Sequence, residues 1–216
     1  LTIYAYFNVL PYHFSPQWQP TQAELERGGI YDRTEENGEY LGQPVTSYEI
    51  PEPKKLAALS VLGQSDGANK RIEVDLTNQR IYAYEGNQKV MEFVVSTGKW
   101  GATPTGTFTI AYKTRAQLMK GGSRALNTYY YLPNVPFVQF FGNGEIPWSR
   151  GFSFHGTYWH DKFGTPQSHG CINMKIADAE KLYYWTTPSL GDKRTAKATP
   201  ENPGTPVVIY GTTPRS

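Results

Sequence analysis

RIEVDLTNQRIYAYEGNQKVMEFVVS, residues 71–96, is the stretch that points most clearly to a fold. Polar and apolar residues alternate over 71–76 and again over 80–85, and the polar residues 77–79 between them suit a turn. Gly86-Asn87 is a second hairpin signal, and it precedes the apolar segment 88–96. Alternation of this kind is typical of strands that bury one face. The stretch therefore predicts a meander of three antiparallel strands.

More strand signals follow this meander, whereas helix signals are few. A helix is expected over 176–186, because Ile176, Ala179, Leu182 and Tyr183 fall on one stripe. The 21 glycines and 16 prolines favour many turns and short strands. We therefore predict a mainly β fold, a β-sandwich or small barrel with one or two short helices. Further strands are expected at 107–112, 129–132, 137–141, 151–155 and 205–210.

Residues 1–69 differ in character from the rest of the chain. A strand at 3–7, a short helix that begins near Thr21, and a linker that ends with 63–69 are expected there. We interpret 1–69 as an extension, or the remnant of an upstream module, and 70–212 as the main domain. Because the chain opens on leucine, we expect a processed chain or part of a longer one, with any signal peptide or membrane anchor outside it.

Composition excludes several classes of protein. With 38% hydrophobic and 19% charged residues, the chain of 216 residues has a globular composition and not a disordered one. Its longest uncharged window, 125–144, is interrupted by proline, asparagine and glycine, so no membrane-spanning helix is expected. Residues 1–69 carry a net charge of −5 and residues 70–216 one of +7, but the basic residues are scattered. Nucleic-acid binding, which needs a clustered basic stripe, is therefore not expected.

The single cysteine, Cys171, is the first chemical lead. One cysteine allows neither an intrachain disulfide nor a cysteine-rich zinc site. His169 precedes it by two residues, and His155 ends an expected strand upstream. On an extended strand His169 and Cys171 would share a face, and His155 would reach that face from a neighbouring strand. A histidine that accepts the thiol proton would make a nucleophile, with the amides of Gly170 and Cys171 as candidate oxyanion donors.

Two other interpretations of this segment stay open. The thiol could be an inert buried side chain, which is the usual state of a lone cysteine. A zinc site is the second alternative, although the spacing of His169 and Cys171 is unusual for zinc ligands. We expect neither a metal nor another cofactor. The zinc alternative would draw on His155, His160, His169 and Cys171.

The segment resembles the signature of the L,D-transpeptidase catalytic domain family, also called YkuD-like. That signature is a histidine, a loop, and then Ser/Thr-His-Gly-Cys-hydrophobic-Asn/Arg, which His155 and residues 168–173 (SHGCIN) supply. Further similarity lies in the hairpin 71–84, in STG at 96–98 and TPTGTF at 103–108, and in the helix near 178–183. The resemblance covers about residues 70–211. It implies the family's β-sandwich of mixed sheets with a short helix.

The resemblance also implies roles for individual residues. Cys171 corresponds to the nucleophile and His155 to the general base, held by the carbonyl of Gly156. His169 corresponds to the second site histidine. Asn173 stands where many bacterial members have arginine. Site-shaping positions are matched by Ser168, Gly170, Gly156 and Asn173, and the aromatic residues predicted to contact substrate are Tyr158, Trp159 and Phe141.

The implied activity is acyl transfer on peptidoglycan stem peptides, forming 3→3 cross-links through a Cys171 thioester. An L,D-carboxypeptidase with the same site, or an inactive wall-binding module, are the alternatives. Carbapenem β-lactams are expected as covalent inhibitors, and an extracytoplasmic location at the cell wall follows from the substrate. Four further aromatic residues are expected either to line the substrate groove or to pack in the core. They are Tyr129, Tyr130, Tyr131 and Trp148.

Overall fold

The computed structural model describes residues 28–51, 69–191 and 193–215. The strand expected at 3–7, the helix expected from Thr21 and most of the expected linker lie outside these residues. No helix among the described residues is long and apolar enough to cross a membrane.

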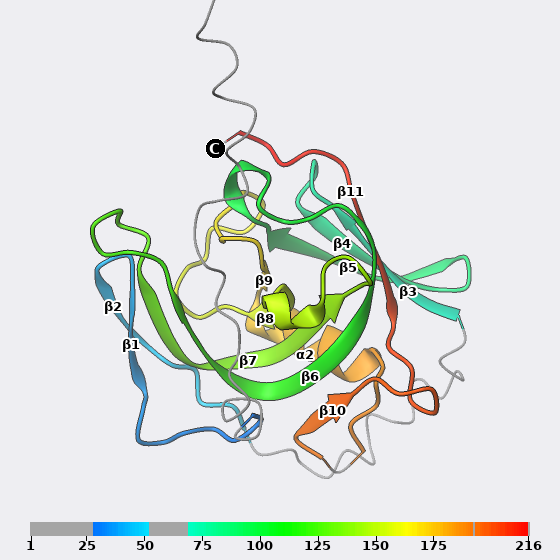
Figure 1. Ribbon diagram of the computed structural model, residues 1–216, viewed down its shortest axis with the longest axis horizontal. Helices are drawn as coiled ribbons and strands as arrows, with labels where there is room; N and C mark the ends of the chain where they lie inside the picture. The colour runs from blue at the N-terminus through cyan, green and yellow to red at the C-terminus, as the bar shows by residue number, and fades with distance from the viewer. Residues whose placement is uncertain (1–27, 52–68, 192, 216) are drawn as a thin grey trace, which may run out of the picture.

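The described strands form one mixed sheet that curves into a barrel (Figure 1). In chain order they are β1 (Asn37–Tyr40), β2 (Gln43–Thr46), β3 (Lys70–Asp75), β4 (Arg80–Glu85), β5 (Gln88–Ser96), β6 (Gly106–Gly121), β7 (Tyr130–Gly142), β8 (Ser153–Gly156), β9 (Ile172–Met174), β10 (Thr195–Lys197) and β11 (Pro206–Tyr210). Their order in the sheet is β10-β6-β11-β3-β4-β5-β9-β8-β7-β1-β2. An additional pairing of β6 with β7 joins distant parts of this order and closes the barrel. The prediction of a mainly β, barrel-like fold is confirmed.

The predicted meander is present as β3, β4 and β5, paired antiparallel in sequence order. Ile72 and Val74 on β3 and Ile81 and Ala83 on β4 are completely buried, so the alternation in the sequence does mark the core face. β5 then pairs with β9, which connects the meander to the strand that follows Cys171.

Two strands are much longer than predicted. β6 continues past its apolar beginning through a run that includes Lys113 and Arg115, both buried. β7 runs through Pro133 and Pro136, and its pairing with β6 shifts register twice. Charged residues and prolines normally end a strand pattern, which is why the sequence predicted three short strands where two long ones form.

The predicted helix is α2 (Ile176–Trp185), and it lies against β7 and β8. It buries Ala179, Leu182 and Tyr183, as the stripe predicted. Lys113 on β6 donates from Nζ to the carbonyl oxygens of Tyr183 at 2.5 Å and Thr186 at 2.8 Å. A lysine at the helix C-terminus supplies donors to carbonyls that have no partner within the helix.

The hairpin of β1 and β2 was not predicted. Its turn residues, Leu41 and Gly42, both have positive φ, 51° and 77°. Two-residue hairpin turns of this type usually carry asparagine, aspartate or glycine at the first position, so leucine gave no signal. β1 pairs antiparallel with β7, with Glu39 opposite Tyr131 and Tyr40 opposite Tyr130.

Candidate active site

The site is built on the parallel pair β8 and β9. Phe154 is opposite Ile172 and His155 is opposite Asn173 in this pair. Because side chains alternate along a strand, Ser153 and His155 share a face of β8, and Asn173 continues the same face on β9. This is the neighbouring-strand arrangement that the sequence predicted for His155 and Cys171.

Cys171 lies just before β9, and the residue as a whole is half-buried. Its Sγ lies 3.5 Å from Ser153 Oγ and donates to the carbonyl oxygen of Gly151 at 3.5 Å. Burial raises the pKa of the thiol, while the side-chain and backbone hydrogen bonds from Ser153 act in the opposite direction. The resting form is therefore a protonated thiol that needs a base to become a nucleophile.

His155 is buried and has a fixed ring orientation. Its Nδ1 lies 3.2 Å from the carbonyl oxygen of Gly156, the contact that the resemblance implied. A carbonyl only accepts, so Nδ1 carries the proton and Nε2 keeps its lone pair. Burial lowers the pKa of His155 to about 4, and the hydrogen bond to Gly156 only partly offsets this. The imidazole is neutral at pH 7 and is chemically competent to accept a proton.

Gly156 is needed for close packing as well as for its carbonyl. A Cβ at this position would lie 2.9 Å from Pro136 Cγ and 3.2 Å from Ile176 Cγ1. The glycine therefore lets β8 approach both β7 and the start of α2, and this keeps the carbonyl beside the ring of His155.

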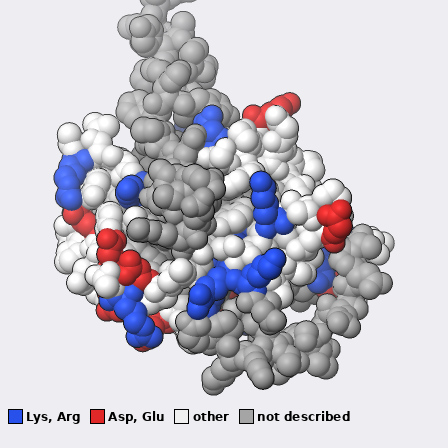
Figure 2. Space-filling view, turned by 60° about the horizontal axis from the view of Figure 1, so that its bottom comes forward, with Lys and Arg blue, Asp and Glu red and all other residues white. Residues whose placement is uncertain are grey.

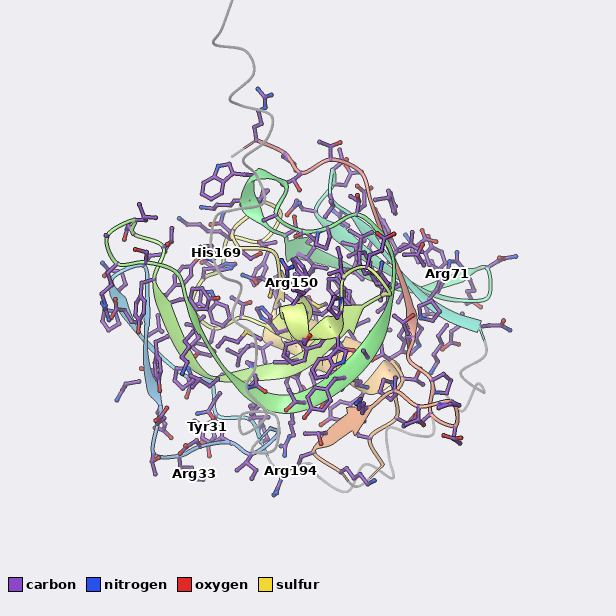
Figure 3. All side chains as sticks on the ribbon, in the orientation of Figure 1. Tyr31, Arg33, Arg71, Arg150, His169 and Arg194 are labelled. Atoms are coloured by element: carbon purple, nitrogen blue, oxygen red, sulfur yellow. The ribbon has the colours of Figure 1, made fainter. Side chains whose placement is uncertain are left out.

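His169 reaches the same pocket by a different route from the one predicted. β9 begins at Ile172, and Gly170 has a φ of 143°, so His169 and Cys171 do not lie on one extended strand. That expectation is wrong because the chain turns at the glycine. The His169 ring instead stacks on Tyr130 of β7, with ring centroids 5.4 Å apart. Burial, and then the charge of Lys99, lowers the pKa of His169. Figure 3 labels His169 on the side of the barrel where the β6–β7 hairpin curves round.

Ser168 shapes this turn through its hydroxyl. Its Oγ donates to the carbonyl oxygen of Cys171 at 2.5 Å and accepts from the Gly170 amide at 3.0 Å. The Gly170 amide is thus already engaged, which corrects its assignment as an oxyanion donor; the Cys171 amide remains a prediction. Thr103 Oγ1 also donates to the carbonyl oxygen of Gly170 at 2.9 Å, which ties the TPTG segment to the turn.

Asn173 has a partner that the sequence did not suggest. Its Nδ2 lies 2.7 Å from His160 Nε2, and an amide nitrogen only donates, so this histidine nitrogen accepts. Burial lowers the pKa of His160 to about 4, which keeps the ring neutral at pH 7 and maintains the hydrogen bond.

Of the three aromatic residues predicted to contact substrate, only one lines the pocket. Trp159 lines the pocket and lies 5.5 Å from His155 between ring centroids. Tyr158 donates to the carbonyl oxygen of Pro133 at 2.6 Å and lies outside the pocket lining. Phe141 is completely buried in the core between Phe108 and Phe152, so its assignment to substrate binding is corrected.

The pocket at the site is small, about 50 Å³ in volume. Ser153, although it bonds the thiol, could have been predicted, because it lies two residues before His155 on an expected strand. The lining residues from distant parts of the chain could not have been predicted, because the sequence does not specify how their strands pair. These residues are Tyr40, Met119, Tyr130 and Leu132. The lining residues are Tyr40, Met119, Tyr130, Leu132, His155, Trp159, Gln167, Ser168, His169, Cys171 and Asn173.

A metal centre and a basic stripe are the two other types of site that the sequence raised. In residues 28–51, 69–191 and 193–215, no group of three or more histidine, cysteine, aspartate or glutamate side chains could hold a metal ion. The zinc alternative therefore lacks a ligand set there. On the face in Figure 2, lysine and arginine side chains lie in separate groups, with acidic side chains mostly toward the edges.

The chain is similar to a group of known proteins. The family model described as the L,D-transpeptidase catalytic domain (YkuD) matches residues 69–209. YciB of Bacillus subtilis (strain 168), itself named an L,D-transpeptidase only by inference, is 28% identical over 121 residues, which are 52% of this chain and 58% of that protein.

Solved structures are also similar to this chain. The avibactam carbamoyl enzyme of Ldtfm is 27% identical with a TM-score of 0.50, covering 67% of this chain and 49% of that one. The catalytic domain from the E. faecium L,D-transpeptidase is 27% identical with a TM-score of 0.47, covering 68% of this chain and 100% of that one. This chain thus spans 58% of the length of YciB and 49% of the Ldtfm chain.

Proposed function

Because this chain belongs to the L,D-transpeptidase catalytic domain family, we propose that it is a cysteine-dependent acyl transferase acting on peptidoglycan stem peptides. The observation that carries this proposal is that Cys171, the only cysteine in the chain, and a neutral, oriented His155 line the same pocket. A buried imidazole with a free Nε2 lone pair is the group that a protonated thiol needs.

The first half of the reaction transfers the acyl group to the enzyme. Cys171 Sγ attacks the carbonyl carbon that joins the third, dibasic stem residue to the terminal D-Ala. His155 Nε2 accepts the thiol proton and passes it to the leaving amine. The C–S bond forms, the C–N bond breaks, and D-Ala leaves a thioester on Cys171.

The second half forms the cross-link. The side-chain amine of another stem's third residue attacks the thioester, the C–S bond breaks, and the new amide gives a 3→3 link. The proton of that amine returns to the sulfur through His155. His169, Ser168 and Asn173 shape the pocket in this scheme, and Trp159 contacts the substrate.

An assay of purified protein tests the transfer directly. A tetrapeptide donor incubated with an amine acceptor should release D-Ala and give the cross-linked product by mass spectrometry, whereas the Cys171→Ala variant should give neither. Free tripeptide without cross-linked product would assign the chain to the L,D-carboxypeptidase alternative. No turnover of the donor by folded wild-type protein would contradict both and favour a wall-binding module.

Covalent inhibition tests the nucleophile independently of the acceptor. The Ldtfm neighbour is a carbamoyl enzyme formed with avibactam, so covalent capture is a property of that protein. For this chain we propose a carbapenem adduct on Cys171, seen as one added mass on the intact protein and absent from Cys171→Ala. An unmodified wild-type mass after prolonged incubation would argue against a competent nucleophile.

The location and the domain division are proposed together with the substrate. Peptidoglycan lies outside the cytoplasmic membrane, so the proposed activity requires an extracytoplasmic location. Residues 70–212 are the proposed catalytic domain, and 1–69 the extension. Detection of the protein in the cell-wall or periplasmic fraction would support this location, and recovery from the cytosol alone would contradict it.

A further inference from the structure

One wall of the pocket comes from outside the part of the chain that the family model matches. That match begins at residue 69, whereas Tyr40, at the end of β1, is one of the pocket-lining residues. The β1–β2 hairpin is therefore an addition to the family's domain that reaches the proposed site.

The hairpin is held firmly on β7. Besides the β1–β7 pairing, the Leu41 amide donates to the carbonyl oxygen of Tyr129 at 3.0 Å. The buried Asn134 side chain fastens the preceding segment: its Oδ1 accepts from the Asp32 amide at 2.8 Å, and its Nδ2 donates to the carbonyl oxygens of Asp32 at 2.9 Å and Glu35 at 3.2 Å. These contacts make the hairpin a fixed wall of the pocket.

The Tyr40 side chain extends from the β1–β2 hairpin to the loop that precedes Cys171. Its hydroxyl donates to the carbonyl oxygen of Gln167 at 3.5 Å, next to the SHGC turn. Its ring centroid lies 6.2 Å from that of Trp159 and 6.3 Å from that of His160. These contacts bury most of the side chain, and this burial raises the pKa of its hydroxyl.

From this placement we infer that Tyr40 is a specificity-determining residue that limits the size of the group able to reach the Cys171 thiol. The pocket of about 50 Å³ is lined by Tyr40 as well as by Trp159 and Cys171, and the Tyr40 and Trp159 rings lie beside each other in this lining. Under the proposed function, on which this substrate assignment rests, Tyr40 limits the bulk of the acyl donors that can bring their scissile carbonyl to the thiol. Replacing the tyrosine ring with a methyl group would open the pocket to bulkier donors.

Thiol labelling tests the size limit without requiring transferase activity. Because Cys171 is the only cysteine, intact mass reports its reaction with N-methylmaleimide and with N-cyclohexylmaleimide, two N-alkyl reagents that share the reactive ring and differ in bulk. The measured quantity is the ratio of the bulky to the small labelling rate. We expect this ratio to rise about tenfold in Tyr40→Ala, to change little in Tyr40→Phe, and to fall in Tyr40→Trp.

Tyr48→Ala is the matched control, because Tyr48 lies on the same N-terminal segment, is 38% exposed and lies outside the pocket lining. Labelling in urea should give every variant the same ratio. An unchanged ratio in folded Tyr40→Ala would overturn the inference, and if that variant fails to fold, an unchanged ratio in Tyr40→Trp would do so. A shifted ratio in a protein with no donor turnover would leave the size limit standing and refute only the proposed function.

Discussion

Burial sets the protonation states of the two groups that exchange a proton in the proposed reaction. It lowers the pKa of His155 to about 4 and raises that of Cys171, so at pH 7 the pocket that both residues line holds a neutral imidazole and a protonated thiol. The pair therefore does not rest as a thiolate–imidazolium ion pair. The thiolate forms only when His155 takes the proton, and the carbonyl of Gly156 then stabilises the charged ring through Nδ1–H.

The low pKa of His155 should be visible in protein stability. An unfolded histidine titrates near pH 6.5, so between pH 6.5 and 4 the unfolded chain binds more protons than the native one. The contribution of His155 to the free energy of unfolding is therefore fully present above about pH 6.5. It falls by about 3 kcal/mol as the pH is lowered to 4. The check is urea unfolding of wild type and His155→Gln at pH 7.5 and 4.

Carboxylates also titrate in this pH range, but they contribute equally to both proteins. The difference in pH dependence between wild type and His155→Gln therefore reports His155 alone. Cys171→Ala is the matched control, because it keeps His155 and should follow the wild-type pH dependence. Equal loss of stability in His155→Gln and wild type would show that the native imidazole is not held neutral.

The charge of Lys99 should act on His169. Burial is the main cause of the lowered pKa of His169, and the Lys99 ammonium lowers it further by like-charge repulsion. Lys99→Met should therefore raise the pKa of His169 toward its ordinary value, measured by NMR titration of the imidazole C–H signals. Lys181→Met removes an exposed charge on α2 and should leave that pKa unchanged. An equal shift in both variants would point to net charge and not to Lys99.

Local sequence was sufficient for residues whose chemistry and strand neighbours both lie near Cys171. His155, Ser168, Asn173 and Trp159 all line the pocket that holds Cys171. The failures share one physical cause, which is that a pattern does not specify pairing partners. Phe141 was predicted to contact substrate but is buried in the core. Tyr40 lies 131 positions before Cys171 and lines the same pocket only because β1 pairs with β7.

At the scale of elements, the β1–β2 hairpin depends on one side chain of β7. Asn134 has a φ of 52°, a left-handed conformation that asparagine tolerates better than most residues. It therefore serves both as the bend in β7 and as the partner of the chain at Asp32 and Glu35. Asn134 of β7 thus binds the segment at Asp32 and Glu35, which is far away in the sequence.

Asn134→Gly should release the hairpin without straining β7, because glycine accepts positive φ. Loss of the side-chain hydrogen bonds should lower the free energy of unfolding by about 1–3 kcal/mol. Hydrogen exchange should accelerate in β1 and β2 and stay slow in β3–β5. Asn127→Gly is the control, because Asn127 also has positive φ, 51°, but is exposed in the turn between β6 and β7. Uniform acceleration throughout the barrel would contradict a local role.

At the scale of the whole molecule, the sequence predicted the architecture but not how the barrel closes. Alternation in 71–96 and the stripe of α2 were enough for the meander and the helix. Closure depends on β6 and β7, whose buried polar residues and prolines hide the strand pattern. Lys113 shows why: a lysine in mid-strand indicates an exposed position, yet here it is completely buried because α2 offers it carbonyl oxygens.

Lys113 should consequently give the barrel a pH-dependent stability at the alkaline end. Burial, and then the charge of Lys70, holds the pKa of Lys113 well below its ordinary value. Between that lowered pKa and about 10.4, where an unfolded lysine titrates, the unfolded chain binds more protons, so stability rises with pH. Urea unfolding at pH 7 and 9.5 should show wild type gaining stability relative to Lys113→Met.

The substitution has a second, pH-independent consequence. Methionine fills much of the lysine volume but leaves the carbonyls of Tyr183 and Thr186 without their donor, which should cost about 1–3 kcal/mol at pH 7. Lys197→Met, at an exposed position of β10, should show neither effect. If Lys113→Met and wild type kept the same stability difference at both pH values, the amine would be titrating as an exposed one.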